Sequence, residues 1–164
     1  MIIDREVAAV IMALCIVGSV LGIAFVLRSS TLQPFIALAL LNSHCVMGPY
    51  PRYVVLNTSI RLCIFIDNHL GEPIYWMVIY RIGTQSTLPT NTSPSSAPAI
   101  AVWHGILDNG KNITFRVSVP IKLPPSLVNA SRIALIFELW IYEPGRGWVY
   151  SGRWTHLYVE VIHH

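Results

Sequence analysis

Two cysteines outside the most apolar stretch of the chain carry the clearest chemistry. Cys45 and Cys63 are eighteen residues apart, whereas Cys15 lies inside a long uncharged run. In an oxidising compartment such a pair can close a disulfide, which would constrain the unfolded chain by about 3 kcal/mol. A competing interpretation groups His44, Cys45 and Met47 as soft copper ligands. The sequence favours the disulfide, because adjacent strand residues point to opposite faces and the ligand spacing of a blue-copper loop is absent.

The other titratable residues form no catalytic or metal motif. The six histidines include no pair at the helical spacing of a zinc site, and no four ligands fall in short-spaced pairs. No carboxylate lies in a nucleophile or phosphate-loop motif. Glu138 alternates with an apolar face, and we expect it to form a partly buried structural ion pair with Arg153. The sequence therefore predicts a protein that is not an enzyme, with no catalytic residues, cofactor or metal.

Four asparagines open an Asn-x-Ser/Thr glycosylation acceptor, where chance would give about one. They are Asn57, Asn91, Asn112 and Asn129. The excess indicates N-glycosylation and therefore an extracytoplasmic C-terminal domain, with Pro94 disfavouring use of Asn91. The alternative is that Asn, Ser and Thr merely gather in turns.

The aromatic content offers a second kind of candidate site. The tryptophans are Trp76, Trp103, Trp140, Trp148 and Trp154. Core packing is the favoured interpretation. The alternative is an exposed patch that contacts a partner protein or a sugar ring, because Trp and Tyr dominate interface hot spots.

An uncharged run of twenty-one residues, 7–27, would hold the C-terminal domain at a membrane. As a helix it would span about 30 Å, the thickness of a hydrocarbon core. A cleaved signal peptide would have a basic start and a shorter apolar stretch. We therefore expect a single-pass anchor in the cell membrane. Because Arg5 and Arg28 nearly cancel under the positive-inside rule, orientation rests on the glycosylation acceptors.

Beyond Arg28 the apolar residues recur at every second position, which is typical of strands. About seven antiparallel strands in an immunoglobulin-like β-sandwich are predicted. The predicted strands are Ser59–Asp67, Ile74–Arg81, Ala99–Leu107, Ile113–Val119, Ile133–Tyr142 and Trp154–Ile162.

Three segments make up the predicted organisation of the chain. Residues 1–28 form the transmembrane anchor, 29–52 a connecting segment leading into the sheet, and 53–164 the β-sandwich domain. Within the last, the Ser/Thr/Pro-rich stretch 84–98 is too polar to offset its ordering entropy and should be a mobile surface loop.

Composition narrows the class of partner. Hydrophobic residues make up 54% of the chain and charged residues only 12%, against about 25% in typical soluble domains. The eleven Lys and Arg are scattered, so nucleic-acid binding is not expected. Membrane lipid, other membrane or envelope proteins, and glycan are the expected partners.

Several motifs resemble those of one family. The stretches 68–76, 137–142 and 150–154, the last containing Gly-Arg-Trp, resemble archaeal membrane-anchored proteins that carry the domain of unknown function numbered 1616. The resemblance covers roughly residues 32–161. It implies an archaeal cell-surface location and a β-sandwich, and it implies no activity.

Three functions remain open at this point. We expect a non-catalytic accessory or structural subunit that docks through its β-domain onto a larger membrane or cell-envelope assembly. The alternatives are a binding module for glycans or envelope polymers, and a pilin-like filament subunit. The short Met1–Glu6 leader, which lacks a small-residue processing site, disfavours the last.

Overall fold

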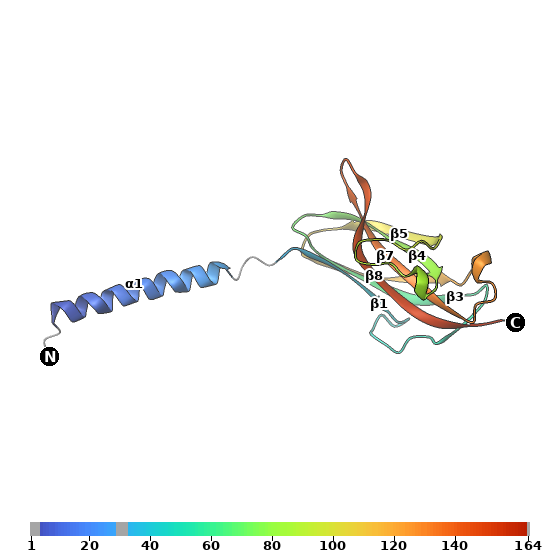
Figure 1. The fold of residues 1–164 in the computed structure, drawn as a ribbon, viewed down its shortest axis with the longest axis horizontal. Helices are drawn as coiled ribbons and strands as arrows, with labels where there is room; N and C mark the ends of the chain where they lie inside the picture. Colours follow the sequence, from blue (N-terminus) through green and yellow to red (C-terminus); the bar gives the residue numbers. More distant parts are fainter. Residues whose placement is uncertain (1–3, 29–32, 164) are drawn as a thin grey trace. The chain divides into compact units, whose positions relative to one another are not determined.

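The computed structural model describes residues 4–28 and 33–163 and divides the chain into two compact units between Pro34 and Phe35. The predicted 1–28 anchor and 29–52 connecting segment each include a few residues outside those ranges. The first unit contains one helix and the second contains only strands and two short 3-10 turns (Figure 1).

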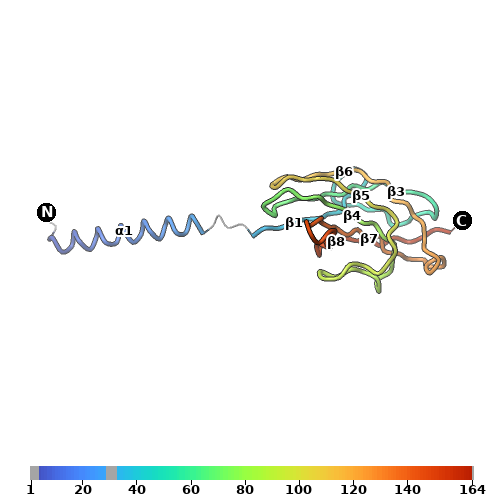
Figure 2. The backbone as a smooth tube through the Cα atoms, turned by 90° about the horizontal axis from the view of Figure 1, so that it is seen from above, coloured from blue at the N-terminus to red at the C-terminus, as the bar shows by residue number. Residues whose placement is uncertain are grey.

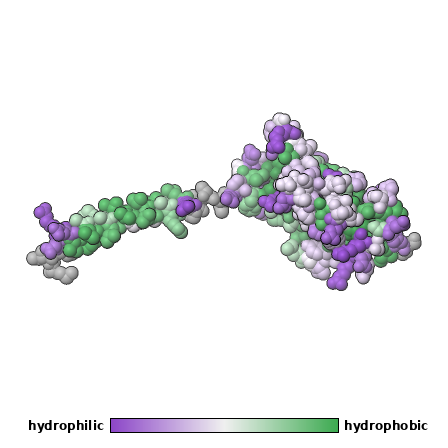
Figure 3. Space-filling view, viewed as in Figure 1, coloured by the Kyte–Doolittle hydropathy of each residue, from purple (hydrophilic) through white to green (hydrophobic). Residues whose placement is uncertain are grey.

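Helix α1, Arg5–Arg28, is long and apolar enough to cross a membrane. It begins after Asp4, whose carbonyl accepts the backbone N–H of Ala8 at 3.0 Å. Glu6 lies in the first turn and Arg28 in the last, as the helix dipole favours. Its apolar side chains lie on all sides instead of along one stripe, a pattern that suits lipid. Figure 3 shows the apolar residues that cover the visible face of the helix.

The second unit is a β-sandwich with eight strands, close to the seven predicted (Figure 2). One sheet has the order β1-β3-β6 and the other the order β2-β8-β7-β4-β5. The strands are β1 (Phe35–Leu41), β2 (Tyr53–Val55), β3 (Ser59–His69), β4 (Ile74–Gly83), β5 (Ala99–Leu107), β6 (Lys111–Pro120), β7 (Arg132–Glu143) and β8 (Gly147–Ile162).

The strand order is that of an immunoglobulin-like sandwich, which confirms the predicted fold class. The described strand pairs are antiparallel with one exception, because β2 runs parallel to β8. Alternate residues of both sheets meet in the core, as period-2 patterning requires. Fully buried members include Leu62, Ile64, Ile66, Tyr80, Ile82, Val119, Ile133, Leu135, Phe137 and Leu139.

Strand β1 lies inside the range predicted to be a connecting segment, so the sandwich begins at Phe35 and not at residue 53. It pairs with β3 along its whole length, and Ile36 and Leu40 are only 6% exposed. The sequence Phe-Ile-Ala-Leu-Ala-Leu-Leu has no polar residue to mark an outward face. Period-2 patterning therefore could not reveal this strand.

Candidate functional site

Cys45 and Cys63 form a disulfide, with their Cα atoms 5.2 Å apart. Cys63 is fully buried on β3, and Cys45 lies in the turn that follows β1. Asn42 shapes that turn, because its side-chain oxygen accepts the backbone N–H groups of His44 and Val46. The disulfide takes up the sulfur that a copper site at His44 and Met47 would need.

The four glycosylation acceptors are all exposed. Asn57 lies in the turn between β2 and β3, Asn112 on the edge strand β6, and Asn129 in the segment before β7. Asn91 lies in the 84–98 loop, where its backbone carbonyl packs against Gly152. Exposure therefore does not predict which of the four acceptors are glycosylated. Pro94 is the feature that distinguishes Asn91 from the other three.

The five tryptophans divide between the two faces of the five-stranded sheet. Trp76 is 4% exposed and stacks on Phe115 in the core, with ring centroids 5.1 Å apart. Trp103 packs toward Tyr80 and Phe137 on the same inner side. Trp140, Trp148 and Trp154 alternate out of the core and lie partly exposed on the outer face. These last three are the tryptophans that the outer face presents to solvent.

Four side chains at one end of that outer face form what we call the aromatic cluster: Tyr75, His104, Tyr142 and Trp148. Tyr75 is at its centre, with ring centroids 4.9 Å from Trp148 and 5.9 Å from His104. Tyr75 and Tyr142 are 39% and 46% exposed. Two members of the cluster, Tyr142 and Trp148, lie on the β7–β8 hairpin, which projects from the sandwich in Figure 1. These rings form a rigid, uncharged, partly exposed surface of the kind that protein partners and sugars contact.

A second row of rings follows β8 on the same face. His156 lies between Trp154 and Tyr158, with ring centroids 5.4 and 4.9 Å away, and Arg132 stacks over the Tyr158 ring. Partial burial lowers the pKa of His156 below the ordinary histidine value of 6.5. The ring is therefore held in its neutral form between its aromatic neighbours.

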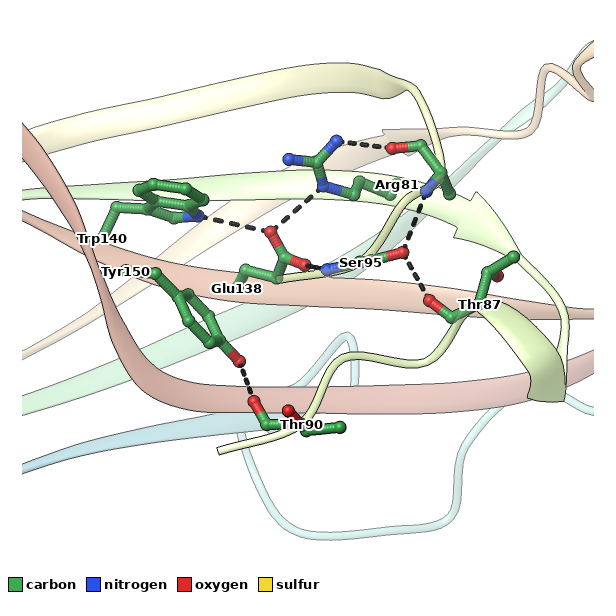
Figure 4. Close-up of polar contacts among 8 residues, drawn as sticks. Arg81, Thr87, Thr90, Ser95, Glu138, Trp140 and Tyr150 are labelled. Carbon is green, nitrogen blue, oxygen red and sulfur yellow. Dashed lines mark hydrogen bonds and ion pairs between the residues drawn. The ribbon is translucent and has the colours of Figure 1, made fainter. Parts of the chain in front are cut away.

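Between these two groups the outer face is closed by the 84–98 loop, which lies on the side of β7 and β8 away from β3 and β6 (Figure 2). Glu138, on β7, is fully buried beneath it. Its carboxylate accepts the Arg81 Nε–H at 3.1 Å, the Trp140 indole N–H at 3.2 Å and the backbone N–H of Ser95 (Figure 4).

The loop itself continues this hydrogen-bond network. Arg81 also donates to the Ala97 carbonyl, and the Ser95 hydroxyl donates to the Thr87 carbonyl. The Tyr150 hydroxyl donates to the Thr90 carbonyl at 2.8 Å. Burial, and then the negative charge of Glu138, raise the pKa of Tyr150 to about 12, so this donor keeps its proton.

These contacts correct two expectations from the sequence. The ion-pair partner of Glu138 is Arg81, not Arg153, because Arg153 lies opposite Leu139 one position away on β8. The 84–98 loop, predicted to be a mobile surface loop, is packed against the sheet at Ser95 and Ala97, which are buried. Polar contacts order the loop where apolar area could not.

Arg81 and Ser95 are therefore site residues that sequence reasoning missed. A signal for Arg81 existed, because it is an isolated charge at the end of the apolar run Ile74–Tyr80. Ser95 gave none, since it lies among seven other Ser and Thr residues of the loop. The carboxylate is enclosed by donors, which indicates a structural role and not acid–base chemistry.

A groove opens on the other side of β5, between β5 and β6. Its volume is about 460 Å³. The lining is Trp76, Val102, Trp103, His104, Gly105, Ile106, Ile113 and Phe115. No group of three His, Cys, Asp or Glu side chains that could hold a metal occurs within residues 4–28 and 33–163.

Comparisons with known proteins leave the family open. No family model and no curated protein matches the sequence. Among solved structures, 79% of this chain resembles 89% of a CARDB domain from Pyrococcus furiosus, at 10% identity and a TM-score of 0.44. A DNA glycosylase from Pseudomonas fluorescens, AlkC, is matched over 77% of this chain and 30% of its own, at 14% identity and a TM-score of 0.47. A β-glucosidase from Listeria innocua has 11% identity and a TM-score of 0.43, and this chain spans 16% of its length.

Proposed function

We propose that this protein is a non-catalytic, single-pass membrane subunit whose β-sandwich docks outside the cell onto a larger membrane or cell-envelope assembly. Helix α1 serves as the anchor, and the sandwich is the part that binds. The aromatic cluster on the outer face of the five-stranded sheet is the observation that carries this proposal.

The cluster supports docking because it combines exposed apolar area with rigidity. Tyr75, His104, Tyr142 and Trp148 hold one another in place through ring contacts, and the Tyr75 hydroxyl lies 3.3 Å from the His104 ring nitrogen. Nearby Ile106 and Val102 are 73% and 45% exposed. Aromatic side chains that are already ordered lose little entropy on binding, which makes them effective contact residues.

The extracytoplasmic placement is supported by the sequons and the disulfide. Four acceptor asparagines are exposed, and structural disulfides occur mainly in oxidising compartments. The mean hydropathy of α1 and its uniform apolar surface support a membrane-spanning role.

Mild detergent extraction of the full chain from its native membrane, followed by native mass measurement, tests the proposal. We expect a complex heavier than one 18.3 kDa chain with its glycans. Tyr142→Ala should weaken the complex at least tenfold, whereas Tyr53→Ala should not. Tyr53 is the matched control because it is 61% exposed on β2, outside the cluster. A monomer at every concentration would contradict the proposal.

Glycan binding is the second candidate, and the same rings favour it because aromatic faces also stack on sugars. A glycan-binding module would be monomeric, and its tryptophan fluorescence would change on addition of envelope oligosaccharides. Trp148→Phe should reduce that change, since Trp148 belongs to the cluster.

A further inference from the structure

Strand β5 is an unprotected sheet edge. It is the last strand of the five-stranded sheet, and within the described residues it pairs with β4 alone. Its nine residues include no Asp, Glu, Lys or Arg. The three-stranded sheet has two edges, and one of them, β6, carries Lys111, Arg116 and the glycosylation acceptor Asn112. The other edge, β1, is also uncharged but lies against β8 of the facing sheet. Charges and bulky groups on an edge prevent pairing with another chain, so β6 is protected and β5 is not.

The groove beside β5 follows from the unequal strand numbers. Three strands face five, so the inner side of β5 is only partly covered by β6. The stacked rings of Trp76 and Phe115 line the groove, together with Ile113. Gly105 is required here, because a Cβ at this position would lie 2.8 Å from the Trp76 ring.

The ring of Trp76 lines the groove, whereas its indole N–H is buried and the described structure gives it no hydrogen-bond acceptor. A buried donor without a partner costs free energy. Because this N–H is enclosed by the sandwich, the apolar ring is the part of Trp76 that a ligand in the groove can contact.

We propose that β5 accepts an extended strand from another polypeptide as a sixth strand of its sheet. The free backbone groups of β5 require an extended chain, and its lack of charge matches a neutral strand. Apolar side chains at alternate positions of the added strand enter the groove and contact the Trp76 and Phe115 rings. This inference rests on the proposed docking function and names the kind of partner.

Other ligand classes fit the groove less well. Its lining contains no charged side chain, which disfavours nucleotides, phosphate and metal ions. Sugars need several hydrogen-bonding groups, whereas the polar side-chain groups of the lining are the His104 ring and the indole N–H groups of Trp76 and Trp103, of which that of Trp76 is buried.

The first test uses the native complex and two lysine variants of the full chain. Ile106→Lys places a charge on the β5 edge at a residue that is 73% exposed, so folding should be preserved. Val128→Lys, at 51% exposure and away from β5, is the matched control. We expect Ile106→Lys alone to weaken the complex at least tenfold, and the β5 amides to exchange hydrogen more slowly in the wild-type complex than in the isolated chain.

The second test replaces the unknown partner with a lysine-flanked peptide of alternating threonine and valine. We expect this peptide to slow hydrogen exchange in β5, and a version N-methylated at alternate residues to have no effect. The N-methyl groups remove the backbone donors and leave the side chains unchanged.

The outcomes separate the two proposals. A complex that survives Ile106→Lys, with unchanged β5 exchange, overturns the added strand and leaves the docking function standing. A complex made only of copies of this chain overturns the choice of a foreign strand. If the wild-type chain is monomeric throughout, the docking function fails. The peptide then decides the inference: selective protection of β5 supports it, and absence of protection overturns it.

Discussion

At the scale of single residues, the polar cluster around Glu138 is the most demanding feature of the sandwich. A buried carboxylate is tolerated only when donors surround it, and Arg81, Trp140 and Ser95 supply them. The arrangement links the sheet to a loop that has little apolar area of its own. The same residue therefore stabilises β7 and orders the 84–98 loop.

Glu138→Ala should destabilise the domain by about 3–5 kcal/mol, because it leaves the partly buried Arg81 charge and the Trp140 and Ser95 N–H groups without their acceptor. Chemical denaturation measures the loss. Glu143→Ala removes the exposed pair with Arg146 and should cost about 0–1 kcal/mol. Equal losses in the two variants would show that the buried cluster has no special role.

The same variant should also release the loop. Limited proteolysis of Glu138→Ala is expected to cut within residues 84–98 under conditions where the wild-type chain is resistant. The reason is that the Ser95 backbone and Arg81 lose their common acceptor. Resistance equal to that of the wild type would mean that the other loop contacts suffice.

His156 should make the domain less stable in mild acid. Burial lowers its folded pKa below 6.5, so the unfolded chain binds the proton more tightly. Above about pH 6.5, His156 therefore does not make the free energy of unfolding depend on pH. Below that value, the free energy of unfolding falls as the pH decreases. Denaturation curves between pH 7 and pH 5 measure the slope. His156→Gln should flatten it, and an unchanged slope would assign the effect to other groups.

At the scale of elements, the disulfide and the glycines determine how the connections lie. The Cys45–Cys63 bond ties the segment between β1 and β2 to the centre of β3. This segment contains little regular structure and so lacks the regular backbone hydrogen bonds of a strand. The disulfide holds it against the sheet instead.

Reduction, or the Cys45→Ala, Cys63→Ala double variant, should lower the free energy of unfolding by about 3 kcal/mol on the chain-entropy model for an eighteen-residue loop. Denaturation with and without reductant measures this. Cys15→Ala is the control, because Cys15 lies on α1 and is unbonded. Reductant sensitivity that persists in the double variant would contradict the assignment.

Gly152 and Gly145 allow a matched comparison. Both have positive φ, +75° and +83°, so alanine is strained at either position. A Cβ at Gly152 would also meet the Asn91 carbonyl, whereas Gly145 has open space. Gly152→Ala should therefore cost about 1–3 kcal/mol more than Gly145→Ala in thermal or chemical denaturation. Equal costs would show that the loop gives way without penalty.

At the scale of the whole molecule, the prediction concerns which asparagines carry glycan. The exposed acceptors Asn57, Asn112 and Asn129 should each be modified in the native host, and Asn91 should not, because Pro94 follows its acceptor. Intact-mass measurement of single Asn→Gln variants tests this: three should lose one glycan mass and Asn91→Gln none. A native chain without any glycan would contradict the extracytoplasmic placement.

The sequence was sufficient to predict an element and its buried face wherever the spacing of apolar residues reflects which side chains are buried. The uncharged run 7–27 corresponds to α1, and alternation in β3, β6 and β7 identified their core faces, because a strand with one buried face must alternate. Core packing, the favoured interpretation of the tryptophans, applies to Trp76 and Trp103, whereas Trp140, Trp148 and Trp154 lie partly exposed on the outer face. Strand β1 was missed because its residues are apolar on both faces.

Only the tertiary structure decided which residues far apart in the chain meet. Arg81 and Glu138 are fifty-seven positions apart, and their contact depends on the pairing register of β4 and β7. The packing of the 84–98 loop depends on its contacts with Glu138, Arg81 and Tyr150, and the groove beside β5 on the unequal number of strands in the two sheets. Periodicity records which face of a strand is buried, but it carries no information about what lies against that face.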